Sequence, residues 1–394
     1  MKKILFLFLI LTLNINAQWN NISSNTTNHL RDIVFTSATT GYIVGDNGTI
    51  LKTTDSGNTW NSIYSDVSKN FKSIIFIDDN YGFAITQNQL LKTINGGLDW
   101  SINYTNTITL LNAVYFISNN IGFIGCDDQI LKTIDGGLNW TSYQTNNPIN
   151  SISFPTLNTG YFVGGSDVSS VLYKTTNQGI SYSTQNILMQ CVKEKVSFIS
   201  ENIGYIIGWY SPLIKKTING GSTWDTLGNF EGGMDINFIN EQFGYYLDNA
   251  GGFSKVYNTI NGGSSWINEL SISTNTSLYG FAKIAIKNNF AVVVGENGLI
   301  YKKENILSNN NFKKKENLIN IYPNPTNDGF IFINYDLNEV KINSVSIINI
   351  LGEVIVVLKD NFEAINAKSF SDGIYLLKFD TTKGIITKKI IIKN

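Results

Sequence analysis

The sequence is poor in the side chains that most often carry out chemistry. Its 394 residues include one histidine, His29, one arginine, Arg31, and two cysteines, Cys126 and Cys191. Two cysteines and one histidine cannot build a zinc site of thiolates and imidazoles, so we expect no metal and no cofactor. His29 has no identifiable nucleophile as a partner, so we do not expect it to act as a catalytic base. An exported protein can pair two cysteines, and the sequence leaves that pairing open.

Charge and long apolar runs are also scarce. Charged residues make up 15% of the chain and the formal net charge is −1, which gives no electrostatic case for binding nucleic acid, since that would need a basic face. The apolar run Ile4 to Leu13 is too short to span a bilayer, and no later run is long enough. Because a lysine pair precedes this run, residues 1–17 are predicted to be a signal peptide cleaved between Ala17 and Gln18. We therefore expect an exported mature protein without a transmembrane segment.

What the chain does contain is a repeated turn. The stretch Thr53 to Trp60 returns 40 residues later as Thr93 to Trp100 and again as Thr133 to Trp140. Two further versions end at Trp224 and Trp266, and a degenerate version ends at Tyr182. A period of about 40 residues with a glycine turn and an aromatic residue predicts a propeller or a similar array.

Each repeat contains four short apolar segments, as a propeller blade does. The first ends in an aromatic residue, as in Asp32-Ile33-Val34-Phe35, and the second opens with glycine and an aromatic residue, as in Gly41-Tyr42. Third strands occur seven times, but fourth strands after the turn occur six times. Trp19 lies 41 residues before Trp60 and supplies the missing strand. We therefore predict an all-β fold, with a seven-bladed propeller over residues 18–303 that its N-terminal strand closes.

The repeated turn resembles the Asp-box of BNR-type propellers, Ser/Thr-x-Asp-x-Gly-x-Thr-Trp. Only Asp55 and Asp135 keep the acid, and asparagine replaces it elsewhere. An Asp or Asn oxygen can accept backbone N–H bonds, glycine supplies a positive φ, and the aromatic residue packs between sheets. The turn lacks the oxygen ligands of a calcium loop. We therefore predict a structural role for its residues, Asp55, Trp60, Asn95, Trp100, Asp135, Trp140, Asn177, Tyr182, Asn219, Trp224, Asn261 and Trp266.

Acidic residues recur in the loops between second and third strands, on the face opposite the Asp-box turns. A cleft lined by one sign of charge would attract a cationic ligand or partner. The alternative is that Asp and Asn are simply the residues that tight hairpins use. The candidate binding rim consists of Asp46, Asp127, Asp128, Asp167, Trp209, Tyr210, Asp248 and Glu296.

The C-terminal part of the chain follows a different pattern. Residues 304–317 are polar and basic, as expected of a linker. Alternating strands with glycine turns then predict a small Ig-like β-sandwich over residues 318–394. The motifs Ile321-Tyr322-Pro323-Asn324-Pro325 and Ser371-Asp372-Gly373-Ile374-Tyr375 resemble those of the type A C-terminal sorting domain of the type IX secretion system, found in Bacteroidetes. An ordinary Ig-like accessory domain is the alternative.

The sorting-domain resemblance has consequences for location and partners. It implies passage through the periplasm, contact with the type IX secretion machinery through residues 318–394, and removal of this domain by a sortase-like peptidase. The mature propeller would then be released or anchored on the outer cell surface.

Asp-box propellers include enzymes, so catalysis has to be considered. Sialidases hold the substrate carboxylate with three arginines, which a chain with one arginine cannot do. Xyloglucan-cleaving members place two acids across a cleft between two propellers, whereas this chain has one propeller. A suitably separated pair of rim carboxylates can in principle hydrolyse a glycoside, but no sequence feature selects a pair.

The glycine-aromatic and Leu-Lys-Thr phrases over residues 18–303 are closer to the photosystem II assembly-factor family, whose members are single seven-bladed binding propellers. The basic binding patch of that family is not matched, and the export signals argue against a photosynthetic role. We therefore predict an exported, non-enzymatic propeller that acts as a protein-binding or adhesion scaffold. The alternative is a surface glycan-binding protein or a glycoside hydrolase of the Asp-box type, and the sequence does not identify the protein or glycan ligand.

Overall fold

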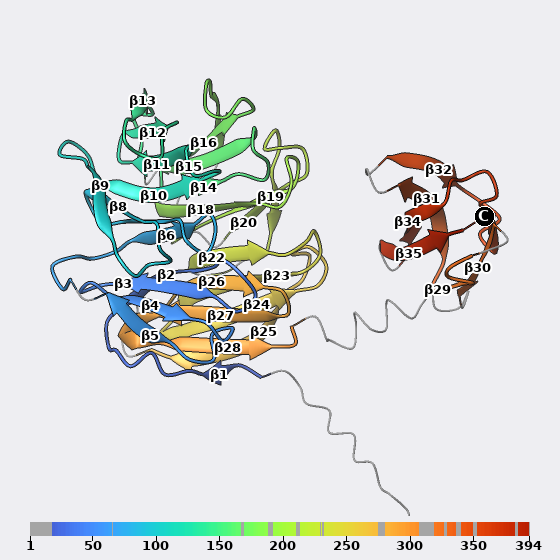
Figure 1. The fold of residues 1–394 in the computed structure, drawn as a ribbon, viewed down its shortest axis with the longest axis horizontal. Helices are drawn as coiled ribbons and strands as arrows, with labels where there is room; N and C mark the ends of the chain where they lie inside the picture. The colour runs from blue at the N-terminus through green and yellow to red at the C-terminus, as the bar shows by residue number, and fades with distance from the viewer. Residues whose placement is uncertain are drawn as a thin grey trace, which may run out of the picture. The chain divides into compact units, whose positions relative to one another are not determined.

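The fold was analysed in a computed structural model (Figure 1). It describes residues 18–394 except for 65, 167–168, 188–191, 210–212, 229, 231, 275–279, 307–318, 327–328, 336–339, 350–352, 383–384 and 394. The predicted signal peptide, including Ala17, and most of the predicted linker lie outside the described residues. The chain divides into two compact units, Met1–Glu304 and Asn305–Asn394. Within the described residues no helix is long and apolar enough to cross a membrane.

The first blade shows how the repeat folds. Its strands β2 (Leu30–Phe35), β3 (Gly41–Gly45), β4 (Ile50–Thr53) and β5 (Asn61–Tyr64) form one antiparallel sheet in sequence order. Phe35 stands directly opposite Gly41 in the register of β2 and β3. A Cβ atom on Gly41 would lie 2.7 Å from the Phe35 ring, so the aromatic residue that ends the first strand requires glycine to open the second.

Five further blades repeat this order, and the same contact between an aromatic ring and glycine recurs in each of them. The strands of these blades, in chain order, are β6 (Ser73–Phe76), β7 (Gly82–Ile85), β8 (Gln89–Thr93), β9 (Ser101–Thr105), β10 (Leu111–Phe116), β11 (Gly122–Cys126), β12 (Gln129–Thr133), β13 (Thr141–Gln144), β14 (Ser151–Ser153), β15 (Gly160–Ser166), β16 (Ser169–Thr175), β17 (Ser183–Ile187), β18 (Val192–Phe198), β19 (Gly204–Trp209), β20 (Ile214–Thr217), β21 (Asp225–Leu227), β22 (Gly233–Phe238), β23 (Gly244–Ala250), β24 (Phe253–Thr259) and β25 (Ile267–Ser273).

The seventh blade joins the two ends of the propeller. Strands β26 (Phe281–Lys287), β27 (Phe290–Gly295) and β28 (Ile300–Glu304) are completed by the short N-terminal strand β1 (Asn20–Asn21). Asn20 stands opposite Lys302 and Asn21 opposite Tyr301. The prediction that the N-terminal strand closes a seven-bladed ring is therefore confirmed.

Aromatic side chains hold neighbouring blades together. The ring of Tyr42 in β3 stacks on Phe76 in the next blade, with centroids 3.8 Å apart, and Trp100 meets Phe76 edge-on. The same three-ring contact recurs at Tyr205, Phe238 and Trp266. Such aromatic pairs add to the stability that their buried area provides, and Trp60 is among the most completely buried large side chains.

The C-terminal unit is a β-sandwich, as predicted. One sheet contains β29 (Ile319–Tyr322), β30 (Phe330–Tyr335) and β33 (Ala364–Asn366). The other has the order β32 (Val354–Leu358), β31 (Ile342–Asn349), β34 (Gly373–Thr381) and β35 (Ile386–Ile392). Alternate residues of β34 face inward, so Tyr375, Leu377 and Phe379 join Ile331 and Ile365 in a core of their own.

Candidate functional site

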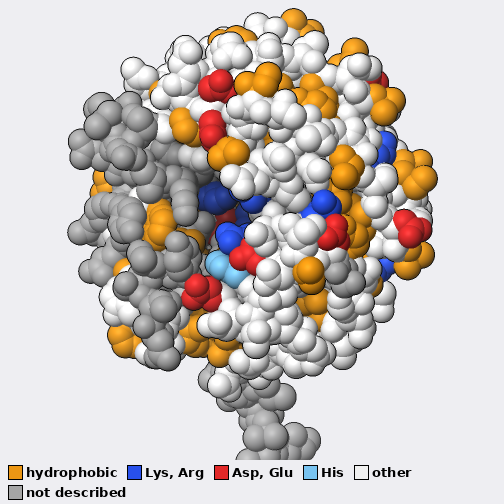
Figure 2. Space-filling view, turned by 90° about the vertical axis from the view of Figure 1, so that its left-hand side faces the viewer, with side chains coloured by type: hydrophobic (Ala, Val, Ile, Leu, Met, Phe, Trp, Pro, Cys, Tyr) orange, Lys and Arg blue, Asp and Glu red, His pale blue; other side chains and the backbone are white. Residues whose placement is uncertain are grey.

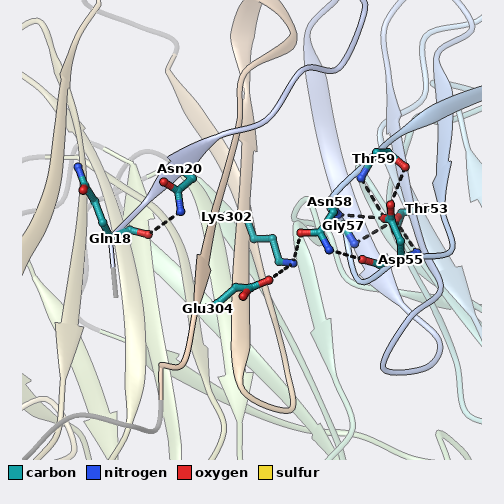
Figure 3. A network of polar contacts seen from close by, with 9 residues as sticks. All are labelled: Gln18, Asn20, Thr53, Asp55, Gly57, Asn58, Thr59, Lys302 and Glu304. Atoms are coloured by element: carbon teal, nitrogen blue, oxygen red, sulfur yellow. Dashed lines mark hydrogen bonds and ion pairs between the residues drawn. The ribbon is translucent and has the colours of Figure 1, made fainter. Parts of the chain in front are cut away.

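We call the face of the propeller that carries the repeated turns the Asp-box face. Hydrogen bonds within each turn hold its conformation, and Figure 3 shows those of the first turn. The Asp55 carboxylate accepts bonds from the backbone N–H groups of Asn58 and Thr59 at 3.0 and 2.9 Å, and from the hydroxyls of Thr53 and Thr59 at 2.7 Å each. Slight burial alone would raise the pKa of Asp55, but these bonds outweigh it and lower the pKa to about 2.

In turns with asparagine, the donor and the acceptor of one of these bonds are exchanged. In the first blade the Thr59 hydroxyl donates to Asp55, whereas the Asn219 amide donates to the Thr223 hydroxyl at 2.8 Å. The Asn95 amide likewise donates to the Asp99 carboxylate at 2.9 Å. The residue four positions after the Asp or Asn therefore supplies whichever group the turn lacks.

A second set of bonds ties each turn to the preceding blade. Lys216 Nζ and the Tyr205 hydroxyl both donate to the carbonyl oxygen of Gly262, at 2.9 and 3.1 Å. The Lys216 ammonium also lies 5.4 Å from the centroid of the Tyr205 ring. Lys52 makes the same contact with Gly96 at 2.9 Å. The polar groups that recur on this face are thus engaged in contacts within and between blades.

The opposite face carries the loops between second and third strands, and we call it the hairpin face. Figure 2 shows that this face is hollowed near its middle, where basic and acidic side chains gather.

The rim acids predicted from the sequence differ in how available they are. Asp46 forms a two-bond ion pair with Arg31, with N–O distances of 2.6 and 2.8 Å. Asp127 accepts a hydrogen bond from the Asn112 amide at 2.8 Å, whereas the side chain of Asp128 is exposed. Glu296 opens a short 3-10 turn, η1 (Glu296–Gly298), and is half-buried.

Asp248 is a correction to the predicted rim. It is 2% exposed, and its carboxylate accepts a hydrogen bond from the Gly232 N–H at 2.6 Å. The reason is that β23 and β24 continue past the expected loop, which places Asp248 opposite Lys255 inside the sheet. Trp209 ends β19 and is half-buried, while Asp167 and Tyr210 lie outside the described residues.

The rim is also not lined by a single sign of charge, contrary to one reading of the sequence. Lys283 forms an ion pair with Asp235 at 3.1 Å, and burial, which lowers the Lys283 pKa, is outweighed by Asp235 and Asp32, so that the pKa is raised. Lys72 donates to the Leu111 carbonyl at 2.9 Å. In the sequence, these lysines lie beside the hydrophobic positions of first strands. That pattern could have indicated basic residues on this face.

Two buried carboxylates on first strands of the blades hold neighbouring blades together. Asp32 accepts a bond from the Ile74 N–H at 2.9 Å, and Asp235 accepts one from the Ile284 N–H at 3.0 Å. Both bonds reach into the next blade around the ring. Because these carboxylates satisfy buried backbone groups, we assign them to the closure of the propeller.

Among the described residues, no group of three or more His, Cys, Asp and Glu is placed to hold a metal ion. Cys126 is a buried free thiol, and its burial, with nearby Asp128 and Asp127, raises its pKa to about 12. Cys191 lies outside the described residues. A thiol with a raised pKa carries little of the thiolate that acts as a nucleophile.

Comparisons with known proteins separate the two units. The family model described as the secretion system C-terminal sorting domain matches residues 320–393. The chain ends in a sorting domain. The chain is therefore exported by type IX secretion, with release or surface anchoring as the outcome, and the sorting domain brings it to the secretion machinery.

The propeller preceding the sorting domain is similar to the photosystem II assembly factor YCF48. That family model matches residues 12–104. The structure of YCF48 from Cyanidioschyzon merolae has a TM-score of 0.60 at 17% identity, covering 73% of this chain and 99% of that one. A YCF48 bound to D1 peptide has a TM-score of 0.58 at 18% identity, covering 73% of this chain and 96% of that one. At these identities the likeness shows the fold alone.

An enzyme also shares the fold. The xyloglucanase from Xanthomonas campestris has a TM-score of 0.56 at 13% identity, covering 74% of this chain and 54% of its own. A search of curated proteins returns no match. The chain is thus a secreted propeller protein, and its fold is shared by a xyloglucanase and by an assembly factor.

Proposed function

We propose that the exported propeller is a non-catalytic scaffold that binds a protein partner at the cell surface through its hairpin face. The observation that carries this proposal is that charged groups of the first strands and of the hairpin loops already have partners within the protein. Arg31 and Asp46 neutralise one another, as do Lys283 and Asp235, and Asp32 supports the neighbouring blade. Groups that are held in this way form a rigid surface of mixed charge.

A surface of this kind favours recognition over catalysis. A glycosidase needs one carboxyl group as an acid and a second carboxylate as a base or nucleophile, both facing the substrate. On this rim Asp46 and Asp127 are engaged with Arg31 and Asn112, and Asp248 is buried. Complementary charges across an interface favour specificity and rapid association of two proteins.

A polypeptide is the ligand class that we favour over a glycan. A YCF48 of similar fold has been solved with a bound D1 peptide, which supports a peptide as the ligand of such a propeller. The exposed Asp128 and the half-buried Trp209 offer an acidic and an aromatic contact on the hairpin face. Aromatic anchors beside charged groups are typical of protein interfaces.

The proposal is tested with residues 18–394, the chain without its predicted signal peptide, against three sets of probes: a peptide array, a glycan array and a panel of glycoside substrates. We expect saturable binding to peptides, weakened in Asp128→Asn, and no turnover of any glycoside. Glu241→Gln, an exposed acid in a turn of the Asp-box face, is the matched control and should bind as wild type does. Hydrolysis of a glycoside that Asp128→Asn abolishes and Glu241→Gln retains would instead establish an enzyme.

A further inference from the structure

The four-stranded sheet of the sorting domain has two apolar faces, although only one of them is covered. Its inner face packs in the core through Ile347, Leu377 and Ile390. Residues directly opposite one another on paired strands point to the same side of a sheet, so the register also defines the outer face.

A row of outward-facing residues crosses all four strands. Val354 stands opposite Ile348, Ile348 opposite Leu376, and Leu376 opposite Lys389. Val354 is 55% exposed and Leu376 40% exposed. Ile374 and Ile391, paired with each other, extend the apolar surface beyond this row. We call these five apolar residues the outer strip.

Two lysines border the outer strip on β34 and β35. Lys389 ends the central row, and Lys378 lies in the next row, opposite Ser346 and Thr387. Both lysines are exposed, and Asp380 follows one row further out. A partner that covers this face therefore needs an apolar surface with acidic groups near its border.

We propose that the outer strip is the surface by which the sorting domain docks on a protein of the type IX secretion machinery, one with an apolar patch bordered by acidic residues. This inference rests on the sorting domain and not on the ligand proposed for the propeller. Two observations point to this occupant. The domain carries the export signal, so the secretion machinery must bind it. An exposed aliphatic strip on the outer face of a β-sandwich is also the kind of surface that marks a protein interaction.

The sandwich offers a matched control on its other sheet. Phe332, in β30, is 41% exposed, close to the value for Leu376, and lies on the outer face of the three-stranded sheet. Threonine is well tolerated in strands, so Val354→Thr/Leu376→Thr and Phe332→Thr remove exposed apolar surface from opposite sides of one domain.

The full-length variants are expressed in a bacterium with a functional type IX system and in an otherwise identical strain lacking it. The readout is the ratio of surface-exposed and released chain to periplasmic chain. We expect Val354→Thr/Leu376→Thr to lower this ratio about tenfold or more, since a few residues at the desolvated centre of an interface carry most of its binding energy. Phe332→Thr should be exported as wild type is, and all chains should stay in the periplasm of the second strain.

A second variant, with the charge of two lysines reversed, keeps the test decisive if the apolar variant does not fold. Lys378→Glu/Lys389→Glu alters only exposed side chains and should also reduce export, whereas Lys378→Arg/Lys389→Arg should not. Thermal unfolding of the purified chains checks that each variant is folded. Normal export of both the threonine and glutamate variants would overturn the proposal, and so would equal loss in Phe332→Thr. A dimer in sedimentation that Val354→Thr/Leu376→Thr disrupts without affecting export would assign the strip to a second copy.

Discussion

Restoring the Asp-box consensus at Asn95 should weaken the second blade. In the wild-type turn the Asn95 amide donates to the Asp99 carboxylate at 2.9 Å. Asn95→Asp removes that bond and places two carboxylates in contact. Like charges 4 Å apart cost about 1 kcal/mol in water and more near a protein surface. A lost hydrogen bond adds about 1 kcal/mol. Since Asp99 is exposed and can turn away, we expect a loss of about 1–2 kcal/mol in the free energy of unfolding.

Two further variants make this prediction specific. Asp99→Asn in the Asn95→Asp background recreates the pair of the third blade, where the Asn139 amide donates to Asp135 at 2.8 Å, so it should restore stability. Asn219→Asp should cost little, because the Thr223 hydroxyl can donate to the new carboxylate as Thr59 donates to Asp55. A comparison of the three variants therefore tests the effect of the side chain four residues after the new aspartate.

The assay is urea unfolding followed by tryptophan fluorescence, at neutral and at acidic pH. The penalty of Asn95→Asp should shrink as the pH falls through about 4, where one of the two carboxyls takes up a proton. Equal stability of Asn95→Asp and Asn219→Asp, or no rescue by Asp99→Asn, would refute the view that these bonds and charges control the turn.

Three other predictions follow from single contacts. Lys216→Met should lower the free energy of unfolding in urea by about 1–2 kcal/mol, since it loses a charged hydrogen bond to Gly262 and the contact with Tyr205. Its half-buried neighbour Lys215 donates one exposed hydrogen bond, to Thr226, so Lys215→Met should change it by less than about 0.5 kcal/mol; equal effects would contradict this. Because the pKa of Asp55 is lowered to about 2, its contribution is complete above the ordinary value of 3.8 and lost as the pH falls toward 2, so melting temperatures should drop over this window less in Asp55→Asn than in wild type. In a Cys191→Ser background, Cys126 should react with maleimide after unfolding but not in the folded protein, and rapid labelling of the folded chain would show that the thiol is accessible.

The blade architecture was predictable because it depends on short-range patterns. The pairing of Phe35 with Gly41 is a contact between strands that are neighbours in the sequence, so it appears as a short motif that recurs from repeat to repeat. The position of Trp19, one period before Trp60, was enough to place the closing strand β1. A regular period limits the number of ways in which the strands can be ordered.

The hairpin face was harder to predict because its contacts join residues far apart in the sequence. The Lys283–Asp235 ion pair connects two blades, and nothing in either repeat alone indicates that these charges meet. Asp248 was misplaced because β23 and β24 form a longer hairpin than the other repeats suggest. Strand length depends on pairing with the partner strand, which turn residues alone do not fix.

The contrast between the two faces bears on where a ligand would bind. On the Asp-box face the same bonds recur from blade to blade, as those from Lys52 to Gly96 and from Lys216 to Gly262 do, so a residue there is constrained by its own turn and by the next blade. On the hairpin face the contacts of the acidic residues differ between blades: an ion pair at Asp46, an amide contact at Asp127 and a buried carboxylate at Asp248. Side chains that the fold does not require to be alike can be fitted to a partner without loss of the ring, and this freedom is greatest at exposed positions such as Asp128.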